Sequence, residues 1–214
     1  MRSTENDPHQ NGFDALLADA DDANRTRKQE REFAHLPDAW DAALPFLLDL
    51  IARHHEAMLA GDGENVMRLR EDAHNLAFKL NGYEAGILAD DDAAGCVLDR
   101  LTRAPDGTMP LWGQSGSFEI THGSMRVRVE IQGLFGICAS VTPWMGFSAH
   151  AVATDEPFLS ETGYRSFLGA GGDLQAGFTP ERYAAQVIAE HVRRELKGRL
   201  VSIEPQYRKR PCEP

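Results

Sequence analysis

The fold expected for this chain is decided by the stretch SMRVRVEIQ, residues 124–132. Apolar and polar residues alternate through it, and a period of two matches a strand, whose successive side chains point to opposite faces. A helix, with 3.6 residues per turn, would not gather the same apolar groups into one stripe. The stretch therefore predicts a strand with one buried face and one wet or partly covered face. The buried face would carry Met125, Val127, Val129 and Ile131, and the other face Arg126, Arg128, Glu130 and Gln132.

Neighbouring segments predict the rest of an antiparallel sheet. Residues 117–121 would pair with the central strand through a hairpin turn at His122-Gly123. Residues 157–173 have no clean period and are expected to form a long, glycine-rich surface loop. Further strands are expected at 109–112, 137–141, 147–153 and 200–203.

Apolar residues at steps of three and four predict helices before the sheet. The first would end at Gly61 and be interrupted at Pro45, because proline lacks an amide proton and restricts the residue before it. The second would run from Val66 to Asn81-Gly82, so that the two form an antiparallel hairpin. The aspartates at 90–92 are expected to open a third helix.

After the sheet, Thr179-Pro180-Glu181 combines a capping hydroxyl, a proline at the first helical position and an acid, which is typical of a helix start. The helix that follows would end at Gly198 and cover the Val127/Val129 face of the sheet. The fold class predicted is α+β: an N-terminal helical layer, an antiparallel sheet of four to six strands, and a C-terminal helix packed on the sheet.

The 214 residues suffice for one hydrophobic core. Residues 1–30 are polar with few apolar anchors, and we expect a flexible acidic/polar arm there, followed by a single α+β domain over residues 31–214. The three cysteines, Cys96, Cys138 and Cys212, form no CxxC pair, which argues against a disulfide framework or a zinc ribbon and favours a reducing cytoplasm. Cys138 is expected to be a small core residue.

The net charge of −11 would repel phosphate backbones, so general nucleic-acid binding is not expected. The basic residues near the C-terminus are interpreted as a solvated helix end and tail. These are Arg193, Arg194, Lys197, Arg199, Arg208, Lys209 and Arg210. No apolar run approaches the roughly 18 residues of a membrane helix, and the polar start of the chain does not resemble a signal peptide. We therefore expect a cytoplasmic protein without a membrane partner.

One pattern on the two predicted N-terminal helices suggests metal ligands. Glu71-x-x-His74 has the spacing of di-iron helical bundles, and His55 lies on the preceding helix. Such bundles need the motif twice and two more carboxylates, so a buried, hydrogen-bonded His74 is the preferred interpretation. The glycine-rich pieces fit neither a P-loop nor a dinucleotide fingerprint, and no metal or cofactor is expected.

A second pattern suggests hydrolase-like chemistry. His150 lies in a predicted strand shortly before Ser160 and Glu161, which would make a nucleophile–base pair with it, and Tyr164 and Arg165 follow. The alternative is a turn held by its own side chains over Ser160 to Gly163.

Aromatic residues in glycine-rich loops suggest a third possibility, a surface that binds a protein or a small ligand without catalysis. The candidates are Trp112, Trp144 and Tyr164. The structural alternative is that both tryptophans plug the ends of the sheet. We expect the non-enzymatic binding function, with the hydrolase as the alternative.

Several phrases together resemble a family of uncharacterised bacterial proteins that is associated with plasmids and integrative elements of proteobacteria. They are VMRLREDAHNLAFKLNG (66–82), LWGQSG (111–116), GFSAHAV (146–152), PFLSETGYRSFLG (157–169) and ELKGRL (195–200). The likeness covers about residues 44–209 and includes no catalytic signature. The resemblance implies a cytoplasmic accessory protein of mobile DNA and favours an interaction module.

Overall fold

The computed structural model describes residues 17, 20, 23–24, 27–137, 139–170 and 172–208. The chain divides into two compact units, Met1–Pro37 and Asp38–Pro214. In the first unit, residues 27–32 are helical. Most of the arm expected over residues 1–30 lies outside the described residues, as do Cys138, Cys212, Lys209 and Arg210.

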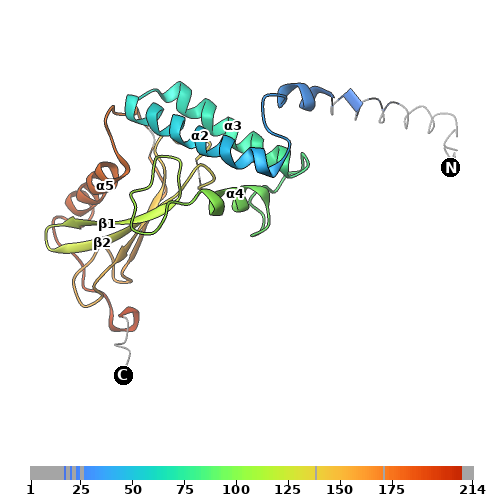
Figure 1. Ribbon diagram of the computed structural model, residues 1–214. Coiled ribbons are helices and arrows are strands. Elements are labelled where there is room, and N and C mark those ends of the chain that lie inside the picture. The colour runs from blue at the N-terminus through green and yellow to red at the C-terminus, as the bar shows by residue number, and fades with distance from the viewer. Residues whose placement is uncertain are drawn as a thin grey trace, which may run out of the picture. The chain divides into compact units, whose positions relative to one another are not determined.

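In the second unit, helices precede and follow the strands of the sheet along the chain (Figure 1). Its elements are α2 (Trp40–Ala60), α3 (Gly63–Leu80), α4 (Ala94–Thr102), β1 (Gly116–His122), β2 (Met125–Ile131), β3 (Phe147–Ala151), β4 (Tyr164–Phe167), α5 (Pro180–Arg194) and the short 3-10 helix η1 (Pro205–Tyr207). The four strands form one antiparallel sheet in the order β1-β2-β3-β4. The predicted α+β fold is confirmed, with N-terminal helices, a four-stranded antiparallel sheet and a C-terminal helix against β1.

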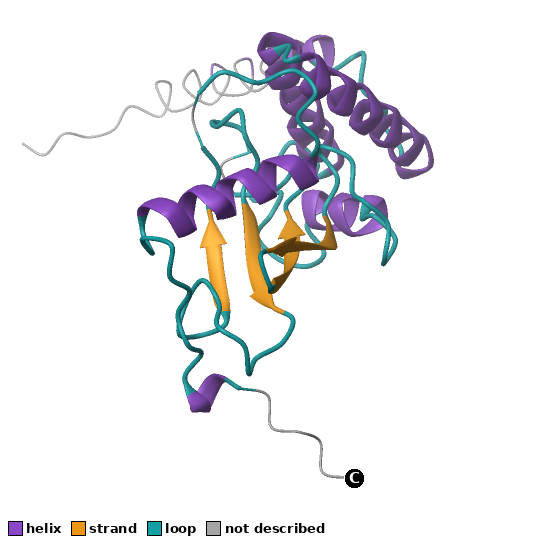
Figure 2. Cartoon of the chain, turned by 90° about the vertical axis from the view of Figure 1, so that its left-hand side faces the viewer, coloured by secondary structure: helices purple, strands orange, loops and turns teal. Residues whose placement is uncertain are grey.

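The alternation in β2 has the predicted consequence, because Val127 and Val129 are fully buried. Phe147 of β3 is paired with Ile131 and therefore lies on the same face of the sheet. The Tyr183 ring of α5 packs edge-on against the Phe147 ring, with 5.9 Å between centroids. Helix α5 thus covers the apolar face as expected, and Figure 2 shows it lying across the strands.

The hairpin between β1 and β2 closes with a two-residue loop, Gly123–Ser124, between His122 and Met125. Gly123 has φ +62°, as the first central residue of a type II′ turn requires. This turn has the twist of the flanking strands and fixes their register. The predicted hairpin is confirmed.

The helical hairpin is confirmed, but the predicted interruption at Pro45 is wrong. Helix α2 continues through Pro45, which lies in its second turn, where one main-chain hydrogen bond is lost. Gly61 ends α2 in the left-handed conformation, with φ +73°. Asp62 then caps α3 by accepting the N–H of Asn65.

The start of the third helix also differs from the prediction. Helix α4 begins at Ala94, after the aspartates, because the Asp90 carboxylate accepts the N–H of Asp92 and holds a turn instead. Helix α5 starts as predicted, with the Thr179 hydroxyl accepting the N–H of Arg182. It ends at Arg194, one turn before the expected Gly198.

Several strand predictions are wrong. Residues 109–112, 137 and 139–141 form loops and turns, and residues 200–203 provide only a single bridge, from Val201 to Phe158. The expected loop 157–173 contains β4. An apolar run becomes a strand only where its main chain can pair with another strand, and here side chains of α2 and α3 bind the main chain at Trp112 and Ala139.

Candidate functional site

The outer face of the sheet, opposite α5, is a polar surface. We define it by the residues that alternate with the buried ones and by their cross-strand partners. They are Ser117, Glu119, Thr121, Arg126, Arg128, Glu130, Ser148, His150, Tyr164 and Ser166. All of them are exposed or half-buried. The sheet therefore offers hydroxyls, charges, an imidazole and a phenol to solvent on one continuous surface.

The strand register aligns one row of this face across all four strands: Glu119, Arg128, His150 and Tyr164. The Glu119 carboxylate accepts from Arg126 at 2.9 Å and lies 3.9 Å from the Arg128 guanidinium. The His150 and Tyr164 rings pack edge-to-face with centroids 5.0 Å apart. Charge is balanced at the β1 end of the row, and the β4 end is aromatic.

His150 has a hydroxyl and a carboxylate nearby that the sequence analysis did not single out. Its Nε2 lies 3.1 Å from the Ser148 hydroxyl and 3.6 Å from a Glu130 carboxylate oxygen. A nucleophile–base–carboxylate triad needs its two partners on different ring nitrogens, whereas here both approach the same one. The signal in the sequence was the spacing of two between Ser148 and His150, which puts both on one face of a strand.

The partners predicted for His150 are arranged differently. The Ser160 hydroxyl donates to the carbonyl of Tyr164 at 2.7 Å and accepts its N–H at 3.2 Å. Thr162 makes similar contacts with the same peptide groups, in agreement with the alternative of a self-held turn. Arg165 is paired with Ala149, so it lies on the sheet face opposite His150. Of the predicted set, only Tyr164 contacts the imidazole.

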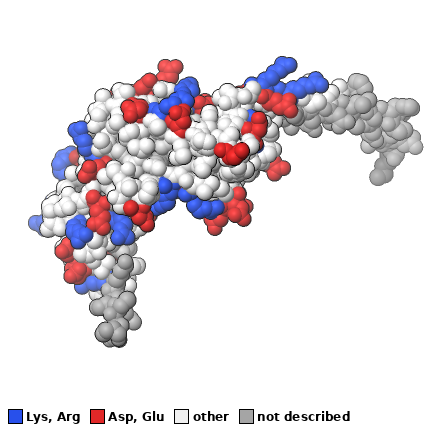
Figure 3. Space-filling view, in the orientation of Figure 1, with Lys and Arg blue, Asp and Glu red and all other residues white. Residues whose placement is uncertain are grey.

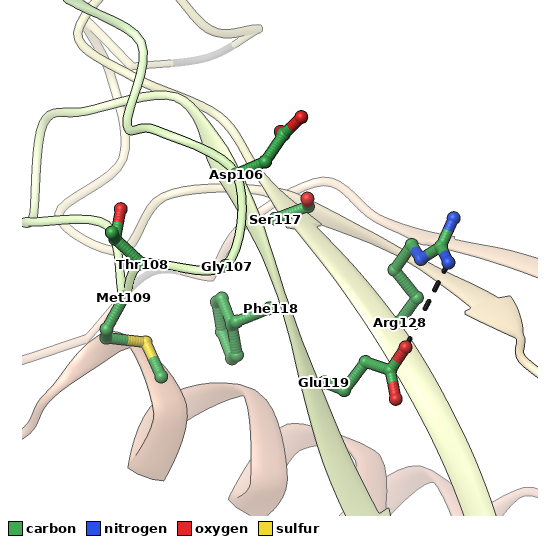
Figure 4. A pocket seen from close by; sticks show the side chains of 8 residues that line it. All are labelled: Asp106, Gly107, Thr108, Met109, Ser117, Phe118, Glu119 and Arg128. Atoms are coloured by element: carbon green, nitrogen blue, oxygen red, sulfur yellow. Dashed lines mark ion pairs between the residues drawn. The ribbon is translucent and has the colours of Figure 1, made fainter.

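A groove runs beside the edge strand β1 (Figure 4). Its volume is about 690 Å³, and it is lined by residues 106–109 of the preceding loop, by Ser117, Phe118 and Glu119 of β1, and by Arg128. In Figure 4 the Phe118 and Met109 side chains lie on one side of the groove, and Asp106, Ser117 and Arg128 on the other. The groove therefore joins an apolar wall to a polar wall along an unpaired strand edge.

The two candidate tryptophans lie in the core. Trp112 is fully buried and Trp144 is 7% exposed, with ring centroids 5.8 Å apart. Tyr183 of α5 stacks on Trp144, and burial raises the pKa of its phenol to about 12. These positions agree with the structural alternative that the tryptophans plug the sheet. Tyr164, by contrast, is 47% exposed.

Two histidines of α2 bind the main chain of Trp112. His54 Nδ1 lies 3.0 Å from the Trp112 carbonyl, and the Trp112 N–H donates to His55 Nδ1 at 3.1 Å. Arg70 Nε of α3 donates to His54 Nε2 at 3.0 Å, so His54 carries its proton on Nδ1. Burial, followed by the charge of Arg70, lowers the pKa of His54 to about 3. Burial also lowers the pKa of His55.

Arg70 is 1% exposed, and it is held by neutral groups. Its Nη1 donates to the carbonyls of Ala139 and Thr142, and its Nη2 to the carbonyl of Pro143 at 2.9 Å. These bonds fix the loop after β2 and explain why residues 139–141 are not a strand. The sequence signal was the position of Arg70 one turn after Val66 and before Ala73, within the apolar stripe of α3.

The candidate metal ligands are not brought together. His74 donates from Nδ1 to the Arg70 carbonyl at 2.9 Å, and its ring lies 5.6 Å from that of Phe135, as expected of a hydrogen-bonded, partly buried histidine. Glu71 and His74 line one pocket of about 580 Å³, whose lining does not include His55. Among the residues that the structure describes, no three His, Cys, Asp or Glu side chains are placed to hold a metal ion.

None of the described helices is both long enough and apolar enough to cross a membrane. No solved structure matches the chain.

Comparison with known proteins gives two kinds of match. Residues 115–198, which contain the sheet and α5, match the family described as KlcB third domain. Two curated Escherichia coli proteins, both called Protein KlcB, are similar in sequence. One is 35% identical over 179 residues, 83% of this chain and 42% of the relative. The other is 38% identical over 157 residues, 72% of this chain and 32% of the relative.

The chain thus spans less than half the length of these relatives. KlcB is plasmid-borne, in agreement with the plasmid context that the resemblance implied, and no specific activity accompanies the match. The chain is homologous to KlcB over most of its length, and its residues 115–198 match the third domain of the KlcB family.

Proposed function

We propose that this protein is a non-enzymatic accessory protein of a mobile genetic element, which acts in the cytoplasm and binds a protein or small-ligand partner through the outer face of its sheet. The observation that carries the proposal is the contact between exposed Tyr164 and half-buried His150 at the β4 end of that face. Homology to a plasmid-borne protein supports the context.

The chemistry of the outer face favours recognition. Tyrosine and arginine are enriched in protein interfaces, because each combines a large contact area with a polar group. Tyr164 is rigidly held, since its N–H and carbonyl both bond to Ser160 and its ring packs on His150. A partner that covers it would therefore lose little side-chain entropy from the Tyr164 side.

The test is a photo-crosslinking experiment in cells that carry the mobile element encoding this protein. A photoreactive benzophenone side chain replaces Tyr164 in one variant and Tyr207 in the other. The two tyrosines are 47% and 48% exposed, so Tyr207 is a matched control for random collision. We expect one defined adduct from position 164 and none from position 207. Equal adducts from both positions, or none from position 164, would refute the proposal.

A hydrolase-like enzyme centred on His150 is the second candidate. The sequence suggested Ser160 or Glu161 as its partner, and the observation that favours the candidate is instead the 3.1 Å approach of Ser148 to His150. A histidine this close is able to act as general base toward the hydroxyl.

A serine-directed fluorophosphonate reagent distinguishes this candidate from the first. If the enzyme exists, the reagent labels wild-type protein, and labelling disappears in Ser148→Ala while Ser166→Ala on the next strand still reacts. Absence of labelling in the folded wild-type protein would count against a serine hydrolase at this site.

A further inference from the structure

We propose that the free edge of β1 is a docking site for an extended segment of a partner polypeptide, which adds to the sheet as a fifth strand. The partner segment alternates apolar and basic residues. This proposal concerns the edge of β1, at the opposite end of the sheet from Tyr164 on β4, and it stands whether or not a partner binds around Tyr164.

The first argument is the direction of the main-chain groups of β1. A two-residue hairpin loop is closed by a pair that exchanges both hydrogen bonds, here His122 with Met125. Hydrogen-bonded and non-hydrogen-bonded positions then alternate along β1. The N–H and C=O groups of Ser117, Glu119 and Thr121 therefore point away from β2, toward the edge of the sheet.

The second argument is that these groups have no protein partner among the described residues. β1 is an end strand of the sheet, and no main-chain bond joins residues 117–121 to any segment other than β2. At the start of the strand, Pro110 and Ala104 of the preceding loop lie against Gly116. The sequence of β1, GSFEITH, contains neither the proline nor the lysine with which proteins commonly block such an edge.

The third argument is the groove itself. The groove, with a volume of about 690 Å³, lies beside Ser117, Phe118 and Glu119, where a fifth strand would run. Met109 is 44% exposed and, together with Phe118, provides an apolar wall for side chains on the inner face of an added strand (Figure 4). A strand that entered here would satisfy the free main-chain groups and cover Met109 at the same time.

The charges specify the chemistry of the partner. On the β2 side of the groove the charge is balanced, because Glu119 is paired with Arg126 at 2.9 Å and lies 3.9 Å from Arg128, which also lines the groove. Asp106 of the preceding loop also lines the groove, makes no ion pair with any described residue, and would be the acid left to face an added strand. The Asp106 carboxylate and a chain charge of −11 favour basic side chains on the incoming strand. They disfavour a second copy of this chain, which would bring its own Glu119 and Asp106.

The experiment measures amide exchange by NMR, with a defined peptide as the probe. A capped peptide copies residues 124–132 with Glu130→Lys, because the native segment already pairs with β1 in a known register that sets Arg128 opposite Glu119. With the peptide at about ten times its dissociation constant, exchange at Ser117, Glu119 and Thr121 slows about tenfold, since only the free protein exchanges. The exposed amides of β4 do not change.

Two controls separate strand addition from other binding. A peptide N-methylated at positions 126, 128 and 130 has the same side chains without the donors that would face β1, and it gives no protection. In the protein, Thr121→Pro removes an outward N–H without removing any main-chain hydrogen bond between β1 and β2, whereas Thr121→Val keeps that N–H. Protection is lost in the first variant and kept in the second. Slow exchange at Val127 and Val129 verifies that both variants are folded.

Three results would overturn the proposal: no peptide-dependent protection at the three amides, equal protection by the N-methylated peptide, or equal protection in Thr121→Pro. Protection that appears without peptide and grows with protein concentration would assign the edge to a second copy of the chain and would also overturn it. None of these results depends on crosslinking at Tyr164.

Discussion

At the scale of single residues, Arg70 is the most constrained group of the protein. A buried guanidinium normally has a carboxylate partner, whereas this one is held by three carbonyls and the neutral ring of His54. Because its planar fork offers five donors in fixed directions, a single side chain can fasten α3 to both α2 and the loop after β2.

We predict that Arg70→Met destabilises the protein by about 3 kcal/mol or more, because buried carbonyls are left without donors. The measurement is urea unfolding followed by circular dichroism. Arg68→Met is the matched control on the same helix, because the Arg68 side chain is 51% exposed in its ion pair with Asp72. We expect it to change the free energy of unfolding by about 0.5 kcal/mol or less. Similar losses in both variants would contradict the role of Arg70.

His54 leads to a prediction about pH. Its pKa is about 3 in the folded protein and near 6.5 in the unfolded chain, so between these values the unfolded state binds a proton that the folded state does not. Stability therefore falls as the pH decreases below about 6.5, by about 2 kcal/mol at pH 5.

The same unfolding measurement at pH 7 and pH 5 checks this, with His54→Gln as the reference. An amide can still accept from Arg70 and donate to Trp112, but it does not titrate. The pKa values of His55 and His191 are also lowered, and both residues are present in the two proteins, so their contributions cancel. An equal loss in wild type and variant would show that His54 is not the group responsible.

At the scale of elements, the β1–β2 hairpin depends on one glycine. Gly123 has φ +62°, where an alanine costs about 1–2 kcal/mol. No neighbour lies within 4 Å of a Cβ added at Gly123 or at Gly63, the first residue of α3, and Gly63 has no positive φ. The two positions therefore differ in backbone conformation and not in crowding.

We predict that Gly123→Ala lowers the free energy of unfolding by about 1–2 kcal/mol. Gly63→Ala is expected to leave it unchanged or to raise it by up to about 1 kcal/mol, because alanine reduces the entropy of the unfolded chain. Chemical denaturation of both variants gives the comparison. If Gly123→Ala were neutral, the turn assignment would be wrong.

At the scale of the whole Asp38–Pro214 unit, Trp112 connects its parts. Its peptide is bound by His54 and His55 of α2, its indole N–H donates to the Phe178 carbonyl at 2.7 Å, and its ring packs on Tyr183 of α5. Helix α2, helix α5 and the segment before α5 therefore all contact the same buried residue, Trp112.

We predict that Trp112→Phe costs about 2 kcal/mol or more, since it leaves the Phe178 carbonyl without its donor and opens a small cavity. Trp40→Phe is the control, because Trp40 is 42% exposed at the start of α2, and we expect a change of about 0.5 kcal/mol or less. Thermal unfolding of the two variants makes the test. A small effect at Trp112 would mean that the helical layer and the sheet are held together elsewhere.

The sequence by itself determined those features that depend on short-range periodicity and local caps. The period-two alternation at 124–132, the apolar stripes of α2 and α3, the hairpin turn and the Thr179 cap each have their cause within a few residues of the chain. For this reason the α+β class, the central strand and the covering helix were predictable.

The tertiary structure alone decided which apolar runs became strands and which polar residues meet. The loops at 112 and 139–143 have strand-like composition, but their peptides are bound by His54, His55 and Arg70, far away in sequence. Ser148 and Glu130 reach His150 because of the strand register, and β1 is an edge because no segment of the described residues pairs beyond it. Such pairings are contacts between distant segments, and no local pattern encodes them.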